Sequence, residues 1–417
     1  MPALPVPERK LHVSLRVVDR GDLTMRLADL AVGLGANVQP GQIVTVGADH
    51  GQSELARAIA ESAYKRGAKF VDVQYFDPYV KRARIAHAAD DTLEFVPSWF
   101  SYRMLAIGEQ RAARISLAGP TTTGLLDDLD PERAGRDQLP FTKEILSVIA
   151  DRTTNWTVVP CPTEPWARLV FPDLLPEEAL DRLWEQVAHV CRLDEPDPVA
   201  AWGERADALT AAADRLNARE FDALHYEGPG TDLTLGLLPT STFHAARDET
   251  VDGIVHLANL PTEEVYATPD PRRADGQVRS TKPLVLADGT IIRGLEVRFA
   301  GGRAVEIDAE QGAGVMRGRA AFDEGASRLG EVALVDREGR IGRLGTVFYD
   351  TLLDENAASH IALGDGSDQG LSEDDRQRRN RSSIHIDFMI GGADVTVTGI
   401  TRDGDRVPVL VDGAWQI

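Results

Sequence analysis

Apolar residues in the first half of the chain recur with two alternating periods. Leucines fall on one stripe at helical spacing across residues 22–34, and the Ala-rich stretch 53–66 repeats this pattern, so both segments predict amphipathic helices. The short apolar runs 42–47 and 70–75 predict buried strands. A strand, a helix and a strand in this order form a βαβ unit, which implies parallel pairing with a right-handed crossover.

The same alternation continues to the middle of the chain. A long Ala-rich helix is predicted over 197–220 as a connector, and Asp197 followed by Pro198 is its start signal. The pattern also predicts strands over 113–118 and 155–160, and helices over 141–150 and 176–191. No strand in this half is followed by G-x-G-x-x-G, so we expect a scaffold, a substrate lid or a dimer surface rather than a dinucleotide site.

The second half differs in composition. Short β-type runs separated by Gly-rich turns predict antiparallel strands. These runs cover residues 223–226, 232–238, 284–286, 290–293, 295–299, 304–308 and 332–335. The remaining pattern predicts helices over 320–329 and 351–363, a mobile surface loop over 365–382, and hairpins around 391–392, 402–405 and 412–413.

The predicted fold class is therefore α/β with two domains. An N-terminal α/β domain with a parallel sheet is expected over residues 1–220. A C-terminal α+β domain rich in antiparallel strands is expected over residues 221–417. A length of 417 residues also favours two domains, because a chain of this size is too long for one hydrophobic core.

Composition and charge exclude several classes of partner. A formal charge of -21 argues against nucleic acid and against anionic membranes. No apolar run approaches the roughly 20 residues of a membrane span, and the first ten residues lack the apolar region of a signal peptide. Cys161 and Cys191 are the only cysteines. One disulfide is conceivable between them, but so low a count favours a reducing cytoplasm.

Histidine and carboxylate residues come together near the C-terminus. On the β-type segment that follows Ser383, His385 and Asp387 would point to the same face of a strand, which suits a metal held against a sheet. The alternative is a solvent-facing strand with two polar residues. Glu355 and His360 are five residues apart, about 140° on a helix, and could still converge. The alternative there is an acid favoured by the helix dipole and a surface histidine.

Two further carboxylate positions precede these clusters. Glu263 and Glu264 follow Pro261, and on an extended chain they face opposite ways, so one could bind a metal while the other acts as a base or faces solvent. The alternative is a capped turn with surface acids. Glu331 lies beside an apolar run, where a carboxylate needs a partner such as a cation. The alternative is a glutamate at a strand edge.

Two histidines and several acids in one domain are more than a single metal needs. A dinuclear site is the simplest explanation, since two cations about 3.5–4 Å apart need a bridging carboxylate and accept a mixed shell of histidine and carboxylate. Such a site indicates hydrolytic chemistry, because structural zinc sites prefer thiolates.

Four separated motifs resemble those of the thermophilic aminopeptidase family, which includes the aminopeptidase T, aminopeptidase S and PepS types. They are NLPTEEVY from Asn259, LGEVALV from Leu329, FYDTLLDENAASH from Phe348 and IHIDFMIG from Ile384. The resemblance covers nearly the whole chain. One departure is the stretch between His360 and His385, which is strongly charged here.

The resemblance implies a metal-dependent exopeptidase that uses two divalent ions, Zn²⁺, Co²⁺ or Mn²⁺, to activate water and remove N-terminal residues from short peptides with a free N-terminus. The positions that match the family's metal ligands are Glu264, Glu331, Glu355, His360, His385 and Asp387, with Glu331 as the bridging ligand. It also implies a homodimer whose N-terminal domain helps to wall an internal cavity. Tyr349 matches a family tyrosine near the site, whose phenol could hydrogen-bond an oxyanion.

Two points stay open on the sequence. Glu263 is a candidate general base because it adjoins Glu264, although a slip of one residue exchanges the two roles. Two other functions compete with the aminopeptidase: a metal-dependent amidohydrolase acting on a small non-peptide amide, and a binding or assembly protein that has lost turnover.

Overall fold

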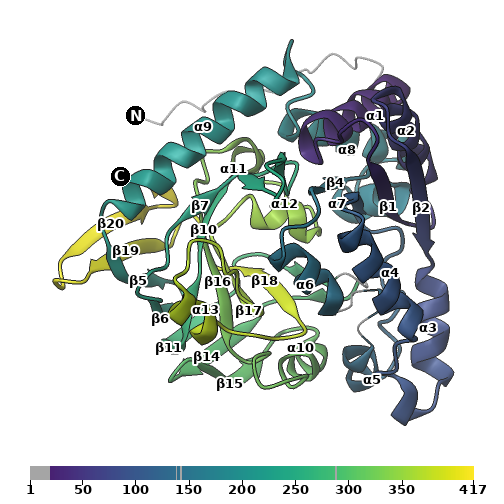
Figure 1. Ribbon diagram of the computed structural model, residues 1–417. Helices are drawn as coiled ribbons and strands as arrows, with labels where there is room; N and C mark the ends of the chain where they lie inside the picture. Colours follow the sequence, from purple (N-terminus) through teal and green to yellow (C-terminus); the bar gives the residue numbers. More distant parts are fainter. Residues whose placement is uncertain (1–18, 138, 141–142, 287–288) are drawn as a thin grey trace, which may run out of the picture.

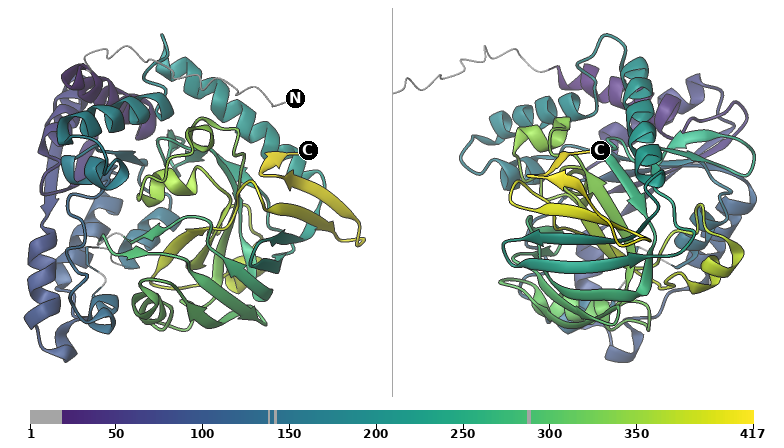
Figure 2. Two further views of the ribbon diagram at one scale, coloured as in Figure 1. Left: turned by 180° about the vertical axis from the view of Figure 1, so that it is seen from behind. Right: turned by 90° about the vertical axis from the view of Figure 1, so that its left-hand side faces the viewer.

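The computed structural model describes residues 19–417, except 138, 141–142 and 287–288. Two halves lie side by side, a parallel α/β half and an antiparallel half (Figures 1 and 2). The predicted fold class is confirmed. No helix in the described part of the chain has both the length and the apolar character that crossing a membrane requires. Cys161 and Cys191 are both free and buried.

The N-terminal half is built on a four-stranded parallel sheet in the order β2-β1-β3-β4. These strands are β1 (Ile43–Asp49), β2 (Phe70–Phe76), β3 (Ala113–Ala118) and β4 (Trp156–Pro160). One face packs on α1 (Arg20–Leu30), a π-helix (Ala31–Gly35), α2 (Ser53–Lys65), α7 (Glu164–Val170) and α8 (Pro176–Val190). Val44, Val46 and Ile115 point into this core and are fully buried. The predicted βαβ unit is therefore present, and its strands pair in parallel.

Several helices of this half have no counterpart in the sequence prediction. They are α3 (Pro78–His87), α4 (Ser98–Glu109), α5 (Pro131–Arg136) and α7. The helix predicted over 141–150 is described as α6 (Lys143–Ala150), and its first two residues lie outside the described part. The connector helix is α9 (Pro198–Asn217), and the Asp197 side chain accepts a hydrogen bond from the Ala200 amide at 3.0 Å, as its start signal predicts.

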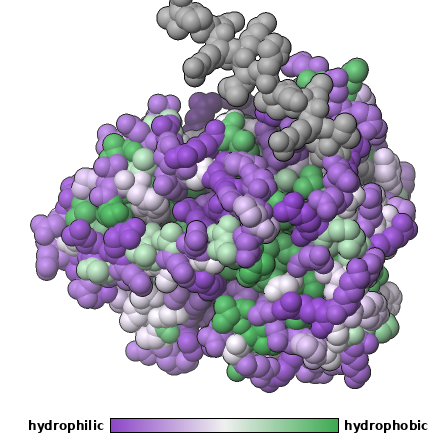
Figure 3. Space-filling model, turned by 90° about the horizontal axis from the view of Figure 1, so that it is seen from above, coloured by the Kyte–Doolittle hydropathy of each residue, from purple (hydrophilic) through white to green (hydrophobic). Residues whose placement is uncertain are grey.

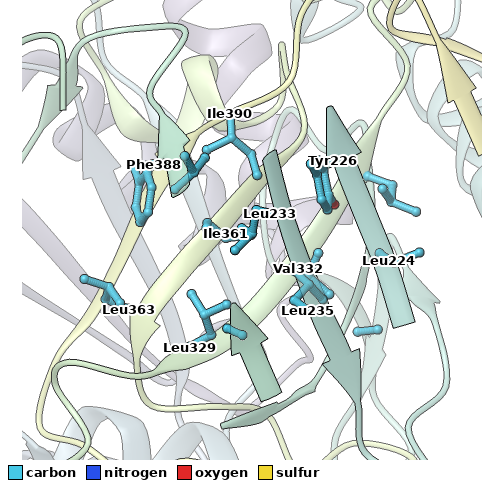
Figure 4. Packing of buried hydrophobic residues seen from close by; sticks show 14 of the residues in the cluster. Leu224, Tyr226, Leu233, Leu235, Leu329, Val332, Ile361, Leu363, Phe388 and Ile390 are labelled. Atoms are coloured by element: carbon cyan, nitrogen blue, oxygen red, sulfur yellow. The ribbon is translucent and has the colours of Figure 1, made fainter. Parts of the chain in front are cut away.

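The C-terminal half contains two large antiparallel sheets. The first has the order β15-β14-β11-β6-β5-β19-β20-β21 and the second β18-β17-β16-β10-β7. Apolar side chains from both sheets meet in one core, where Leu224, Leu233 and Leu235 lie near Val332 and Ile361 (Figure 4). Leu209 and Leu216 of α9 also belong to this core.

The strands of the first sheet are β5 (Phe221–Gly228), β6 (Thr231–Leu237), β11 (Pro269–Arg279), β14 (Glu296–Ala300), β15 (Arg303–Asp308), β19 (Thr396–Thr401), β20 (Arg406–Val411) and β21 (Ala414–Trp415). Those of the second are β7 (His244–Ala245), β10 (Glu264–Ala267), β16 (Leu329–Val335), β17 (His360–Gly364) and β18 (His385–Met389). Two short pairs complete the half, β8 (Arg247–Glu249) with β9 (Val255–Leu257), and β12 (Leu284–Val285) with β13 (Ile291–Ile292).

Two helix predictions in this half are wrong. The helix predicted over 320–329 lies earlier, as α10 (Ala313–Ala320). The helix predicted over 351–363 ends at Glu355, as α12 (Thr351–Glu355), and β17 begins at His360. Ile361 and Leu363 alternate into the core between the sheets, and burial of these side chains outweighs the helical propensity of the preceding alanines.

Two connections also differ from the prediction. The segment predicted as a mobile loop over 365–382 contains α13 (Glu373–Arg378) and is tied down by an ion pair between Asp365 and Arg379 at 3.0 Å. Gly391 and Gly392 lie between β18 and β19, which belong to different sheets, so no hairpin forms there. The other two hairpins, β19–β20 and β20–β21, are present.

The two halves are joined by backbone pairing as well as by α9. The Val158 amide of β4 donates to the Ala258 carbonyl at 2.8 Å, and the Leu260 amide donates to the Val158 carbonyl at 3.0 Å. The segment 258–260 thus continues the parallel sheet beside β4. A few residues later the same chain enters β10 of the five-stranded sheet.

Candidate metal centre

Five polar residues share one face of the five-stranded sheet. Glu264 begins β10, Glu331 lies on β16, His360 begins β17, and His385 and Asp387 lie on β18. The strand register brings them together, because Glu331 pairs with Ala362 and Ala362 pairs with Asp387. Alanine at this central position keeps the space between the carboxylates open.

The opposite face of the same strands is apolar. Val332, Ile361 and Phe388 alternate with the polar residues and are fully buried in the core between the sheets. Because side chains on a strand alternate between its faces, burying these residues directs the neighbouring His and carboxylate side chains to the other side.

Glu331 reaches the polar face through a bulge in β16. Leu329 pairs with Leu363, but Glu331 pairs with Ala362, so Gly330 is an extra residue in this strand. A Cβ atom at Gly330 would lie 2.3 Å from the Asp365 carbonyl oxygen, and only glycine fits. Without the bulge, Leu329 and Glu331 would point to the same face.

The ligand atoms of these residues are close together. Nε2 of His360 lies 3.1 Å from Oε2 of Glu264 and 3.6 Å from Oε1 of Glu331. Nε2 of His385 lies 3.3 Å from Oδ1 of Asp387 and 3.9 Å from Oε2 of Glu331. The two oxygens of Glu331 therefore face different histidines.

Both imidazole rings are oriented by backbone carbonyl groups. Nδ1 of His360 lies 3.0 Å from the Glu355 carbonyl oxygen, and Nδ1 of His385 lies 2.8 Å from that of Asp365. A carbonyl oxygen only accepts, so each Nδ1 carries a proton and donates. This leaves Nε2 of each ring directed at the carboxylates, which is the usual arrangement of metal-binding histidines.

Glu355 comes from the end of α12 rather than from the sheet. Its Oε1 accepts hydrogen bonds from Nδ2 of Asn259 at 3.3 Å and from Nδ2 of Asn356 at 3.5 Å. The predicted convergence of Glu355 and His360 is present. On one regular helix, residues five apart would point about 140° away from each other. Here the helix ends at Glu355 and a strand begins at His360, so this restriction does not apply.

The six residues form three overlapping groups whose ligand atoms all lie within 4.8 Å of one another. The groups are Glu264, Glu331 and His360; Glu331, His385 and Asp387; and Glu355, His360 and Asp387. Oε2 of Glu264 and Oδ1 of Asp387 are buried and accept no hydrogen bond from the described residues. Buried carboxylate oxygens without a donor, beside imidazole nitrogens, fit a divalent cation such as zinc, cobalt or manganese.

The electrostatics of the cluster point the same way. Burial raises the pKa of Glu264, and it raises that of Glu355 further, with repulsion from Asp387 adding to the effect. Burial lowers the pKa of His360, but the facing carboxylates outweigh it and hold this pKa well above its usual range. Without a cation the cluster therefore retains protons, and a bound cation would replace them.

Glu263 is not brought into this cluster. Its side chain is fully buried and forms ion pairs with Arg192 at 2.8 Å and Arg205 at 2.5 Å. Its backbone amide donates to Oδ1 of Asn356 at 2.6 Å. The two adjacent glutamates therefore face different ways: Glu264 faces the cluster and Glu263 faces the N-terminal half.

Tyr349 lies in the loop before α12 with a left-handed backbone, φ = 54°. Asp354 fixes this loop by accepting from the Phe348 amide at 3.0 Å. The hydrogen bond of the Tyr349 hydroxyl among the described residues is with Nη1 of Arg293 at 3.2 Å. The guanidinium of Arg293 also lies over the Tyr349 ring, 5.0 Å from its centroid.

The cluster opens into a cavity of about 680 Å³ between the two halves. His385 and Asp387 line one side of it, and Thr45, Arg114 and Ser116 of the parallel sheet line another. The sequence prediction did not assign these N-terminal residues to the site. The sequence signal that could have identified them is the alternation of polar with apolar residues along β1 and β3.

The surface seen from above is mainly hydrophilic. Hydrophilic side chains cover most of this face, with apolar side chains gathered in smaller groups (Figure 3). This distribution accords with the net charge of -21.

Comparison with known proteins gives consistent matches along nearly the whole chain. The family described as thermophilic metalloprotease (M29) matches residues 22–415. Aminopeptidase T of Thermus aquaticus is 41% identical over 401 residues, which cover 94% of this chain and 98% of that protein. Aminopeptidase PepS of Streptococcus thermophilus is 39% identical over 404 residues, covering 94% and 97%.

A solved structure matches the fold as well. Wild-type AmpT from Thermus thermophilus superposes with a TM-score of 0.83 at 40% sequence identity, covering 95% of this chain and 99% of that one.

The ion pairs of Glu263 lead to a prediction about stability. Glu263→Ala leaves two largely buried guanidinium groups without an anion, so we expect it to lower the free energy of unfolding by about 3–5 kcal/mol. Denaturant unfolding followed by circular dichroism measures this change. The matched control is Glu338→Ala, which breaks exposed pairs with Arg337 and Arg343 and should cost less than about 1 kcal/mol. Equal losses in both variants would contradict an anchoring role for Glu263.

Proposed function

This chain belongs to the thermophilic metalloprotease family M29 and is a metallopeptidase, and from that premise we propose that it removes N-terminal residues from short peptides at a dinuclear metal site. The relatives named aminopeptidases support the exopeptidase activity. The proposed ligands are Glu264, Glu331, Glu355, His360, His385 and Asp387, and Zn²⁺, Co²⁺ and Mn²⁺ all suit this mixture of donors.

The position of Glu331 carries the proposal of two ions. Its Oε1 faces His360 and its Oε2 faces His385, so one carboxylate belongs to two separate groups of ligand atoms. Two cations held about 3.5–4 Å apart need a bridging carboxylate of this kind. Glu264 and His360 would complete one group, and His385 and Asp387 the other.

The chemistry of such a site divides between the ions and the chain. When bound, divalent ions polarise the scissile carbonyl and make water acidic enough to attack it near neutral pH. The chain contributes the carbonyl groups that orient His360 and His385, and the cavity that receives the peptide. We assign Tyr349 as a hydrogen-bond donor to the oxyanion, because its hydroxyl accepts from Nη1 of Arg293 at 3.2 Å and keeps its own proton to donate.

Glu263 is the residue whose expected role as general base is most directly testable. Because arginines hold its carboxylate, we expect Glu263→Gln to keep its metal content and to retain kcat within a few-fold of the wild type. Loss of a general base would instead lower kcat by about 10²–10⁴. Steady-state kinetics with metal content measured on the same sample distinguish these outcomes, and a loss of that size at full metal content would support Glu263 as the general base.

We also propose a homodimer, formed through the N-terminal half. Large exposed aromatic side chains are concentrated there, on β2, on α3 and on and before α4: Phe70, Tyr75, Tyr79, Phe95, Trp99 and Tyr102. An ion pair between Asp72 and Arg103 at 2.7 Å places β2 beside α4. Exposed aromatic surface of this extent is typical of protein interfaces.

Light scattering after size exclusion tests the dimer. The double variant Trp99→Ser and Tyr102→Ser should shift the mass from two chains to one, because it removes two of the most exposed aromatic side chains. Leu175→Ser, at an exposed apolar position preceding α8, is the matched control and should leave the mass unchanged. A monomeric wild type, or a double variant that stays dimeric, would contradict this interface.

The activity itself is tested by adding metal back to stripped protein. We expect cleavage of free-amine dipeptides to return near two equivalents of Zn²⁺, Co²⁺ or Mn²⁺ and to vanish on N-acetylated peptides. Glu331→Gln should prevent uptake of the second equivalent, since it removes the shared ligand. Cleavage of blocked amides or lactams in place of free-amine peptides would identify an amidohydrolase for small non-peptide amides instead.

A further inference from the structure

The parallel sheet of the N-terminal half has one polar face. Strands of parallel sheets are usually apolar on both sides, because helices cover both faces. Here Val44, Val46 and Ile115 face the helices, while Thr45, Arg114 and Ser116 alternate with them on the other face. This polar face lines the same cavity as His385 and Asp387.

Arg114 lies in the middle of a row of residues that crosses all four strands. Thr45 pairs with Asp72 on one side and with Arg114 on the other, and Arg114 pairs with Trp156. The next row contains Gly47, where a Cβ would find its nearest neighbour at 3.8 Å. The polar face is thus recessed beside Arg114, with the hydroxyl groups of Thr45 and Ser116 nearby.

The guanidinium of Arg114 has no partner among the described residues. Its Nη1 is buried and makes no hydrogen bond, and its side chain forms no ion pair with any described carboxylate. Burial lowers its pKa to about 10, so the group stays charged at neutral pH. Arg114 is half-buried, and an enclosed guanidinium nitrogen without an acceptor is costly, so this position favours an anionic ligand.

Other cations of the cavity are already compensated. Arg103 pairs with Asp72 at 2.7 Å, and Nζ of Lys81 donates to the carbonyl groups of Asp137 and Leu139 at 3.0 and 2.6 Å. Arg319, which also lines the cavity, donates from Nη1 to the Asp137 carbonyl at 3.3 Å. Asp49 and Asp350 also line the cavity and would repel an anion near them. Arg114 is therefore the position at which an anion is best stabilised.

We propose that Arg114 binds the C-terminal carboxylate of the peptide whose N-terminus lies at the metal cluster. The inference rests on the proposed aminopeptidase function and names its substrate class, short peptides with a free carboxylate as well as a free amine. A guanidinium matches a carboxylate in two parallel hydrogen bonds, which fixes orientation as well as affinity. Arg114 and His385 line the same cavity, so a short peptide in this cavity has Arg114 near its C-terminus and the clustered residues near its N-terminus.

The test compares free acids with C-terminal amides of the same free-amine peptides, in a series from two to five residues. For the wild type we expect kcat/KM to favour the acid by about 10- to 100-fold at the best length, mainly through KM. Arg114→Met should bring this ratio close to one, and Arg114→Lys should retain part of it. Arg103→Met is the matched control and should keep the wild-type ratio, because Asp72 already compensates that charge.

The possible outcomes separate the two proposals. Equal cleavage of acid and amide by the wild type at every length overturns the role of Arg114 and leaves the aminopeptidase intact. A ratio that Arg114→Met does not change overturns it as well. If an amide with glutamate as its second residue is cleaved as well as the free acid, the anion recognised is a side chain rather than the C-terminus. Failure to cleave any free-amine peptide overturns the proposed function itself. If Arg114→Met does not fold, the wild-type ratio and Arg114→Lys decide.

Discussion

The structure depends on burying several carboxylates against one face of a sheet whose other face is the main hydrophobic core. The carboxylates of Glu264, Glu331 and Asp387 repel one another because they lie close together and away from solvent. Their nearest partners are two histidines that are oriented by hydrogen bonds to backbone carbonyl groups. Such an arrangement is stable when a cation or retained protons offset the charge. The apolar alternation of β16, β17 and β18 keeps it in place, since no strand can turn its carboxylate outward without exposing core residues.

The connection between the two halves gives this centre its surroundings. Residues 258–260 pair with β4 as a continuation of the parallel sheet, and Glu263 is then held by Arg192 and Arg205. The next residue, Glu264, faces the cluster. One short segment therefore links the polar face of the parallel sheet to the face of the antiparallel sheet that carries the clustered His and carboxylate residues, and the cavity lies between these two faces.

Much of this could be predicted where local pattern and tertiary structure agree. The alternation around His385 and Asp387 placed both on one face of a strand, and the βαβ unit followed from its apolar periods. The region of His360 could not, because Ala357 and Ala358 favour a helix while the pairing of β17 with β16 and β18 is long-range. Adjacent glutamates posed a different problem: Glu263 and Glu264 face opposite ways, and which faces the cluster depends on partners more than 50 residues away. The alternation of polar residues along the parallel strands could be read from the sequence. That this polar face lines a cavity could not.

The bulge at Gly330 makes the candidate metal centre depend on the backbone conformation of one residue as well as on the ligands themselves. One extra residue shifts the phase of β16 so that both Leu329 and Val332 reach the core while Glu331 reaches the cluster. If Gly330 were paired in a regular strand, Leu329 and Glu331 would share a face, and either the leucine would leave the core or the carboxylate would leave the cluster. A side chain at Gly330 would also meet the Asp365 carbonyl oxygen. A chain of this kind can therefore keep all six candidate ligands and lose their convergence through a change at a glycine that is not a ligand, which a search for ligand residues would not detect.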